Sequence, residues 1–283
     1  MCVANDDAST PLEGKTIFMS GGSRGVGLAI ALRAAQDGAN VALIAKTDEP
    51  HPKLPGTIHT AAEEIRDAGG RALPIVGDIR DAESVEEAVE RAVEEFGGID
   101  IVVNNASAIN LSGTEELEVK SYDLMQEINV RGAFVVTRAC LPHLKKSGEN
   151  PHVLTLSPPL NLDPKWFGAH VAYTISKYNM SMLTLGWAEE FREDGIAFNS
   201  LWPRTMIATA AVMNLLGGEE AMAQSRNPEI LADAAHAILV RGPECTGNFF
   251  IDEDVLAEEG ITDLDRYRAD PDGSELAVDL FLD

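Results

Sequence analysis

Residues 16–27 read TIFMSGGSRGVG, and this stretch decides the fold of the chain. A short apolar run ends at Ser20, and an amphipathic pattern typical of a helix follows the turn. Gly21 permits the sharp turn, Gly25 lets the backbone approach a pyrophosphate group, and Gly27 allows the helix to pack closely on the strand. The stretch therefore predicts a strand, a tight turn and a helix whose free N–H groups bind the phosphates of a nucleotide.

The rest of the chain repeats this alternation of strand and helix. Short apolar runs lie at residues 16–20, 40–45, 72–76, 99–104, 152–157, 196–202 and 248–251, and amphipathic stretches lie at residues 26–37, 57–68, 82–96, 121–146, 172–194 and 228–240. Continuous apolar runs are typical of strands buried on both faces. We therefore expect an α/β fold, a Rossmann-type doubly wound parallel sheet of about seven strands with helices on both faces. Residues 1–283 form a single domain, with residues 1–13 and about 252–283 as flanking tails.

The chain carries a large excess of negative charge. It has 46 Asp and Glu residues against 22 Lys and Arg residues, so its formal net charge is 22 − 46 = −24. A surface this acidic repels phosphate backbones and anionic membranes, so neither nucleic acid nor a membrane is an expected partner. We interpret the charge as a source of solubility or an adaptation to a salty cytoplasm.

Cysteine and histidine usage indicates neither disulfides nor a metal site. Cys2, Cys140 and Cys245 are too widely spaced for a disulfide framework or a zinc motif, and they suit a reducing compartment. The six histidines show no ligand spacing. The N-terminus has no basic region or apolar core, so no signal peptide is expected, and no apolar stretch is long enough to span a membrane. These features predict a cytoplasmic protein.

A second motif carries the chemistry. Tyr173 and Lys177 are four residues apart and share one helix face, just after the apolar run that ends at Ser157. A Tyr-x-x-x-Lys pattern often arises by chance, but here it lies where sites form in open α/β sheets, at the carboxyl end of a strand. The Ser157 hydroxyl can polarise a carbonyl, and Tyr173 can transfer a proton to or from an alcohol oxygen. Lys177 is expected to lower the phenol pKa from its usual value of about 10.

The glycine turn, with the spacing Gly-x-x-x-Gly-x-Gly, and the Tyr-x-x-x-Lys pair together resemble the short-chain dehydrogenase/reductase family. Ser20 stands where that family usually has Thr, Arg204 stands where many members have Gly, and Ser157 and Tyr173 are a few residues further apart than is common. Residues 46–58 and 157–167 resemble one subgroup of the family. The resemblance implies a dehydrogenase domain alone, without the sterol-carrier-like domain that often follows in this subgroup.

The resemblance also assigns roles to individual residues. Asn129 falls where the family has an Asn that holds a water behind the Lys; a helix-kinking polar residue is the alternative. Asp78 and Asn105 follow strands, where turn chemistry is a competing interpretation. The residues implied in cofactor binding are Gly21, Ser23, Arg24, Gly25, Val26, Gly27, Lys46, Thr47, Asp78, Ile79, Asn105, Ala106, Ser107, Tyr173, Lys177, Pro203, Ile207 and Thr209.

The charges near the second strand favour NADP over NAD. Chains that bind NAD usually place an acid at the end of this strand, where it accepts a hydrogen bond from the ribose. Here Lys46 and Thr47 follow the strand, and Arg24 lies inside the glycine turn. Both cations would attract a 2′-phosphate, although they could also be ordinary surface cations.

The resemblance implies an oxidoreductase that transfers a hydride between NADP(H) and an alcohol/carbonyl pair. Trp166, Phe167 and the Met- and Leu-rich residues 206–218 suggest an apolar small-molecule substrate, although these side chains could equally be core or interface residues. A catalytically silent nucleotide-binding sensor or scaffold on the same fold is the alternative. The four intact residues Asn129, Ser157, Tyr173 and Lys177 argue against it.

Two further expectations concern surfaces. The helices at 121–146 and 172–194 are expected to pair across a two-fold axis in a homodimer or homotetramer. The apolar residues that suggest this are Met180, Met182, Leu183, Leu185 and Trp187. Residues 48–56, with three prolines and Lys53, either order over the adenosine end of the cofactor or form an unrelated surface loop.

Overall fold

A parallel sheet of seven strands forms the centre of the molecule, as the sequence predicts. The computed structural model describes residues 11–50, 54–148, 150–273 and 275–282. The strands are β1 (Thr16–Ser20), β2 (Asn40–Ala45), β3 (Arg71–Val76), β4 (Ile101–Asn104), β5 (His152–Thr155), β6 (Ala197–Trp202) and β7 (Phe249–Ile251). Their order is β3-β2-β1-β4-β5-β6-β7, and every neighbouring pair is parallel. The order reverses between β1 and β4, which is where ligands bind in open α/β sheets.

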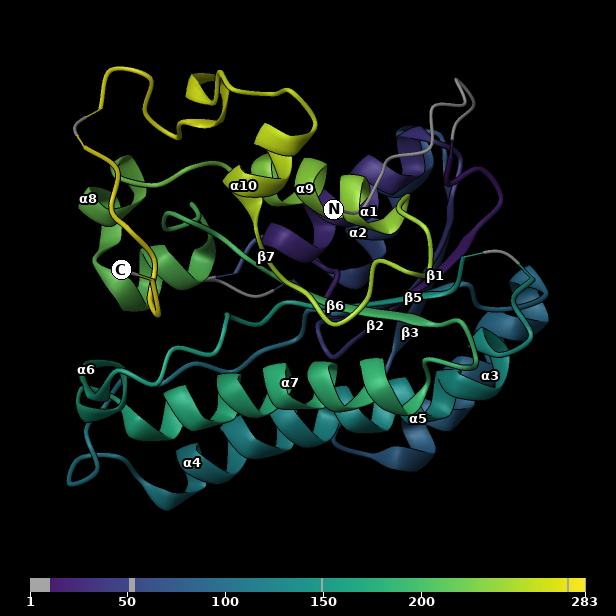
Figure 1. The fold of residues 1–283 in the computed structure, drawn as a ribbon, viewed down its shortest axis with the longest axis horizontal. Coiled ribbons are helices and arrows are strands. Elements are labelled where there is room, and N and C mark those ends of the chain that lie inside the picture. Colours follow the sequence, from purple (N-terminus) through teal and green to yellow (C-terminus); the bar gives the residue numbers. More distant parts are fainter. Residues whose placement is uncertain (1–10, 51–53, 149, 274, 283) are drawn as a thin grey trace.

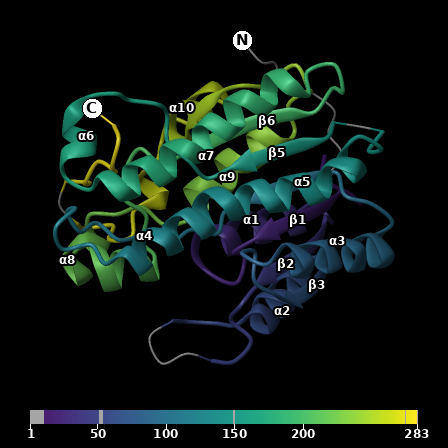
Figure 2. The ribbon, with the colours of Figure 1, turned by 90° about the horizontal axis from the view of Figure 1, so that it is seen from below.

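Two layers of helices enclose this sheet (Figures 1 and 2). The helices are α1 (Gly25–Gln36), α2 (Ile58–Asp67), α3 (Ala82–Phe96), α4 (Val119–Met125), α5 (Ala133–Leu144), α6 (Pro164–Gly168), α7 (Val171–Glu190), α8 (Gly218–Ala223), α9 (Glu229–Leu239) and α10 (Asp252–Glu258). Helices α1, α2, α9 and α10 lie on one face, and α3, α4, α5 and α7 lie on the other. None of the helices in the described part of the chain is long and apolar enough to cross a membrane.

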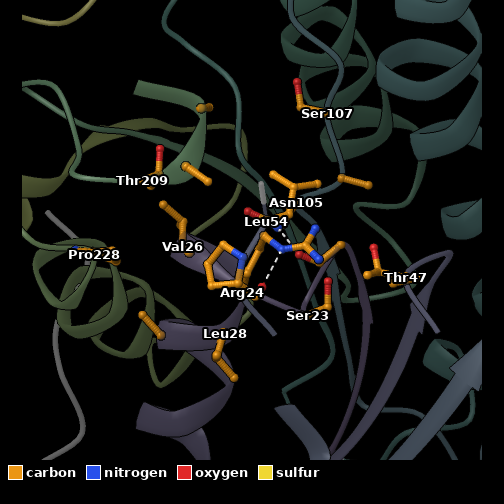
Figure 3. A pocket seen from close by; sticks show the side chains of 18 of the residues that line it. Ser23, Arg24, Val26, Leu28, Thr47, Leu54, Asn105, Ser107, Thr209 and Pro228 are labelled. Carbon is orange, nitrogen blue, oxygen red and sulfur yellow. Dashed lines mark hydrogen bonds between the residues drawn. The ribbon is translucent and has the colours of Figure 1, made fainter. Parts of the chain in front are cut away.

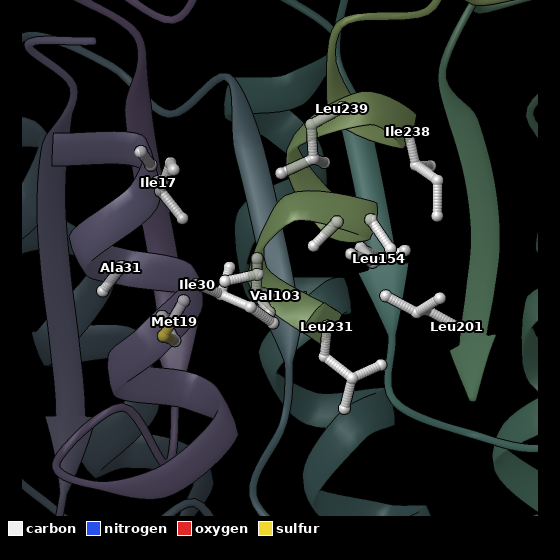
Figure 4. Packing of buried hydrophobic residues seen from close by; sticks show 14 of the residues in the cluster. Ile17, Met19, Ile30, Ala31, Val103, Leu154, Leu201, Leu231, Ile238 and Leu239 are labelled. Atoms are coloured by element: carbon white, nitrogen blue, oxygen red, sulfur yellow. The ribbon is translucent and has the colours of Figure 1, made fainter. Parts of the chain in front are cut away.

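The core has one apolar cluster on each face of the sheet, because successive strand residues point to opposite faces. Ile17 and Met19 of β1 pack under α1 and α9, whereas Phe18 packs under α3, α5 and α7. Figure 4 shows the first cluster, in which Ile30 of α1 and Leu231 of α9 close over the strands. Burial of each such side chain contributes about 1.5–3 kcal/mol to folding.

The helix predicted at 121–146 is regular only at its two ends. Its middle, η1 (Gln126–Gly132), is π-helical, and Asn129 lies inside it. A second π-helical turn, η2 (Val212–Leu216), precedes α8, and a 3₁₀ turn, η3 (Asp265–Tyr267), follows α10. Single π-turns inside helices often occur at functional sites, and apolar periodicity alone does not predict them.

The tail expected from about residue 252 is a folded part of the body. Helix α10 packs on α9, and Val255 and Leu256 belong to the core. The tail expected at residues 1–13 is described only from residue 11 onward, and there Leu12 is buried in the same core. Neither end of the described chain therefore behaves as a loose extension.

Candidate active site

The glycine turn between β1 and α1 leaves no room for a Cβ at Gly21 or at Gly27. Gly21 and Gly25 have φ of +71° and +55°, a region that favours glycine. A Cβ at Gly21 would lie 2.7 Å from the Cα of Ala106. A Cβ at Gly27 would lie 2.5 Å from the Nδ2 of Asn105, so Gly27 packs against the residue after β4 and not only against its own strand. The Asn105 amide donates a 2.7 Å hydrogen bond to the Gly21 carbonyl, which fixes the turn.

A groove of about 1530 Å³ opens over this turn (Figure 3). It is larger than the 300–1,000 Å³ of a typical small-ligand pocket. Many residues predicted to bind the cofactor line it: Gly21, Ser23, Arg24, Gly25, Val26, Lys46, Thr47, Asp78, Ile79, Asn105, Ala106, Ser107 and Thr209. The lining does not include Gly27, Pro203, Ile207, Tyr173 or Lys177, and Ile207 is buried in the core. A cradle of this shape, too tight for a Cβ at Gly21, fits a dinucleotide pyrophosphate.

The cations at the adenosine end of the groove already have partners. Lys46 Nζ lies 3.2 Å from Asp78 Oδ2, and Arg80 also pairs with this carboxylate at 2.6 Å. The hydrogen bonds from Arg80 hold the pKa of Asp78 well below its usual range. The Arg24 guanidinium donates to the carbonyls of Pro55 and Gly56, at 3.0 and 3.2 Å. Sequence reasoning missed Arg80, although its position two residues after Asp78 is a signal for such a pair.

The expected catalytic side chains are held together by contacts between α7 and the end of β5. Lys177 Nζ donates a 2.6 Å hydrogen bond to the carbonyl of Leu156, next to Ser157, and lies 5.0 Å from the ring centroid of Trp202. One helical turn later, Ser181 donates to the carbonyl of Pro158 at 2.5 Å. The helix face is therefore fixed along residues 156–158.

All three expected catalytic side chains are buried. Ser157 is 0% exposed, Lys177 is 2% exposed and Tyr173 is 5% exposed. The Ser157 hydroxyl has no hydrogen-bond partner in the described structure. It is one of twelve buried side-chain polar atoms without a partner in the described residues, and it adjoins the carbonyl that binds Lys177, so it can hydrogen-bond a ligand there.

Burial also sets the protonation of the pair. It lowers the pKa of Lys177 to about 7, against the opposing effect of the Asp279 carboxylate. It raises the pKa of Tyr173, and the Asp279 charge adds to this rise. The lowered phenol pKa expected from the sequence requires the nicotinamide charge as well as Lys177, so it stays a prediction.

Asn129 makes three side-chain hydrogen bonds. Its Nδ2 donates to the carbonyl of Ala108 and to Ser176 Oγ, both at 2.9 Å, and its Oδ1 accepts from the Ala108 N–H at 2.7 Å. The side chain thus links the loop after β4 to α7, while Lys177 binds Leu156. The water-holding role implied for Asn129 stays a prediction.

The last stretch of the chain, expected to lie over the body or in a subunit interface, lies over this centre, which sequence reasoning did not predict. The ring of Phe281 stacks on that of Tyr173, with centroids 6.1 Å apart and an angle of 29° between the planes. Trp166, expected on the substrate side, lies 5.9 Å from Phe281, and Phe167 lies 5.5 Å from Tyr178. The apolar end of the chain, residues 280–282, was the only available signal.

Comparisons with known proteins agree with this geometry. Residues 15–219 match the family model described as short chain dehydrogenase. Hydroxysteroid dehydrogenase-like protein 2 from Danio rerio is 60% identical over 272 residues, which are 96% of this chain and 65% of the relative. The Homo sapiens protein of the same name is 54% identical, over 96% of this chain and 64% of its own length. The chain spans about two thirds of the length of these relatives. The level of identity confirms the subgroup resemblance.

Solved structures share the whole fold. A protein from Xanthomonas campestris superposes with a TM-score of 0.92 at 56% identity, over 96% of this chain and 99% of its own. A short chain dehydrogenase from Mycobacterium thermoresistibile gives 0.91 at 61% identity, over 96% of both chains. An NADH-dependent reductase of alginate metabolism, complexed with NAD, gives 0.68 at 26% identity, over 86% of this chain and 96% of its own.

Proposed function

The chain belongs to the short-chain dehydrogenase/reductase family, and from that premise we propose that it interconverts an alcohol and a carbonyl on an apolar substrate with NADP(H). The observation that carries this proposal is the partnerless buried hydroxyl of Ser157, which lies next to the backbone carbonyl that binds Lys177. A substrate oxygen between Ser157 and Tyr173 would give that hydroxyl its missing partner.

Each of the four expected catalytic residues has its own role in the proposed reaction. When bound, the nicotinamide cofactor supplies or accepts the hydride. The Ser157 hydroxyl donates to the substrate oxygen, and Tyr173 gives a proton to that oxygen during reduction and takes it back during oxidation. Protonated Lys177 stabilises the phenolate. Asn129 holds the loop after β4 against α7.

The preference for NADP rests on charge. Lys46 and Arg24 line the groove on the side where the 2′-phosphate of NADP would lie, and Lys46 and Thr47 follow β2 in place of an acid. A phosphate there would compete with Asp78 for Lys46. The bonds from Arg24 to Pro55 and Gly56 support the proposal that residues 48–56 close over the adenosine end. His51 and Lys53 lie outside the described residues.

Assembly and compartment are part of the same proposal. We expect a homodimer or homotetramer formed through α4, α5 and α7, because Met182 and Leu185 of α7 are 51% and 47% exposed. The sequence also suggested Met180 and Trp187 for this surface. Both side chains are buried, so they do not contribute to the surface. Cys140 and Cys245 are both buried, and a reducing cytoplasm is the compartment that we propose.

The test is oxidation of NADPH by a panel of aldehydes and ketones of increasing apolar size. Turnover that rises with the apolar area of the carbonyl compound is the expected result. Tight NADPH binding without turnover of any carbonyl or alcohol would instead favour the catalytically silent sensor.

A further inference from the structure

The C-terminal strap, defined here as residues 276–282, runs across the substrate side of the active site. Figures 1 and 2 both place it at the α6 end of the molecule. Backbone bonds hold it down: Met206 N–H donates to the Ala277 carbonyl at 2.9 Å, and Asp279 N–H donates to the Arg204 carbonyl at 3.0 Å. The indole N–H of Trp202 donates to the Leu280 carbonyl at 2.9 Å.

Phe281 is the plug of this strap. It is 1% exposed, and its ring lies 5.2 to 6.2 Å from five other rings, which are Tyr178, Trp202, Trp166, Tyr173 and His170. Two of these rings connect Phe281 to the expected catalytic residues. Tyr173 is the expected proton donor, and the Trp202 ring lies against Lys177 Nζ. Phe281 therefore occupies an aromatic cage built on the catalytic residues.

The plug is held in an unfavourable backbone conformation. Phe281 has φ of +73°, which is rare for a bulky residue and costs free energy. Such conformations persist only where surrounding contacts enforce them, and they occur at gates and switches. The strap thus combines strong side-chain contacts with a strained backbone, so a competing ligand in the cage would release that strain.

The closed strap leaves the catalytic centre shut. Ser157, Tyr173 and Lys177 are buried and do not line the cofactor groove. A substrate carbonyl has to reach the Tyr173 hydroxyl, and the ring of Phe281 already covers one face of the tyrosine. Because protein interiors are close-packed, a substrate enters only if something moves.

We propose that the strap is a gate and that Phe281 determines specificity: the strap opens, and an apolar, ring-sized group of the substrate takes the place of the Phe281 ring in the aromatic cage. This inference rests on the proposed function for the substrate's identity as a carbonyl or alcohol. The movement of the strap and the occupancy of the cage do not depend on it. Because Phe281 competes with the substrate, the apparent Kd of the substrate equals its intrinsic Kd divided by the fraction of molecules whose strap is open.

The first arm of the test needs no substrate. Hydrogen exchange of the whole chain should show that the amides of Ala277 and Asp279 open together and exchange at least ten-fold faster than those of β6. Phe281→Ala should accelerate them further. The matched control is Val278→Ala, because Val278 lies on the same strap and is 56% exposed. Strap amides as slow as β6 in the wild type and in Phe281→Ala would overturn the gate.

The second arm measures NADPH oxidation with benzaldehyde and with acetaldehyde. In Phe281→Ala, the KM for benzaldehyde should fall at least five-fold while that for acetaldehyde stays near the wild-type and Val278→Ala values. An equal loss of activity with both aldehydes contradicts a role in specificity and indicates a purely structural plug. Phe281→Leu, which leaves less empty volume, replaces Phe281→Ala if the latter does not fold.

The two arms separate the two hypotheses. If the strap opens as expected but no variant oxidises NADPH with either aldehyde, the proposed function fails and the gate remains. In that case benzyl alcohol should protect Trp202 and Trp166 from fluorescence quenching at a lower concentration in Phe281→Ala than in the wild type. Absence of that protection contradicts the cage as a ring-binding site.

Discussion

At the residue scale, the site depends on a few buried polar atoms whose environments differ. Lys177 has a carbonyl and an indole ring as neighbours, whereas the Ser157 hydroxyl has no partner. Asn129 donates both of its amide hydrogens and accepts one hydrogen bond, so it links the loop after β4 to α7. The chemistry is therefore expected at Ser157, Tyr173 and Lys177, with Asn129 holding their supports.

Tyr173→Phe should lower turnover by about a thousand-fold, because a positioned general acid contributes about 10²–10⁴-fold. Affinity for NADPH should stay within about two-fold, since the glycine turn is untouched. Initial rates and fluorescence titration check the two parts. Tyr122→Phe, on the exposed surface of α4, is the control. Full activity of Tyr173→Phe with any working substrate would falsify the assignment.

Lys46→Asp combined with Arg24→Ser should weaken NADPH binding at least about ten-fold, because each charge-assisted contact contributes about 1.5–3 kcal/mol. NADH binding should change little, since NADH lacks the 2′-phosphate. Lys120→Asp, an exposed cation on α4, controls for two of the three units of charge that the double variant removes. Equal affinity of the wild type for NADH and NADPH by titration would refute the NADP preference.

At the element scale, the strap and η1 connect parts of the chain that lie far apart in sequence. The π-helical turn places Asn129 where it bridges the loop after β4 and α7. The strap carries Asp279, whose carboxyl is buried near Lys177 and Asp252. Burial raises the pKa of Asp279 to about 7, while the Lys177 charge opposes this rise.

This burial makes closure of the strap depend on pH. An exposed Asp has a pKa of about 4, so the closed strap binds the Asp279 proton more tightly than the open strap does. The contribution to closure is complete below pH 4 and is lost as pH rises through 7. Lys177 acts in the opposite direction at higher pH. Burial lowers its pKa to about 7, so its proton is bound more weakly in the closed state, and loss of that proton above pH 7 favours closure.

Hydrogen exchange checks this dependence. Between pH 5 and 7, the opening of the wild-type strap should increase at least about ten-fold after correction for intrinsic exchange, as expected for a pKa that differs by several units. Asp279→Asn keeps the Oδ1 that accepts from the Leu280 N–H and should remove most of this increase. The variant retains Asp252, whose pKa burial also raises to about 7, so any pH dependence that remains in Asp279→Asn is assigned to that carboxyl. Identical pH profiles for both proteins would contradict the prediction.

At the scale of the whole molecule, the acidic surface and the exposed apolar residues of α7 work in opposite directions. A formal charge of −24 opposes association of like chains. Apolar surface on α4, α5 and α7, including Phe134 beside Trp187, favours it. Association through these helices should therefore become stronger when salt screens the charge.

Light scattering at micromolar concentration should give two or four times the mass of one chain. Met182→Lys combined with Leu185→Lys should shift the mass toward the monomer, because both side chains are about half exposed in the isolated chain. Val76→Lys, at the end of β3, is the control. A sharp monomer mass for the wild type, in both low and high salt, would rule out the assembly.

The sequence by itself determined the architecture and the position of the site. The glycine turn, the alternation of apolar runs with amphipathic stretches, and the Tyr173–Lys177 spacing are local patterns, because each depends on residues within one or two elements. Local geometry fixes such features before any long-range contact forms. They were enough to predict seven parallel strands, and the family resemblance supplied the residues that line the groove.

Only the tertiary structure decided what surrounds these residues. The placement of Phe281 on Tyr173, the burial of Met180 and Trp187, and the pairing of Lys46 with Asp78 each join or cover residues from different elements. No period in the sequence encodes such contacts, since they depend on how whole elements pack. The same packing raises the pKa of Tyr173, because desolvation is a property of the closed core and not of any local stretch of sequence.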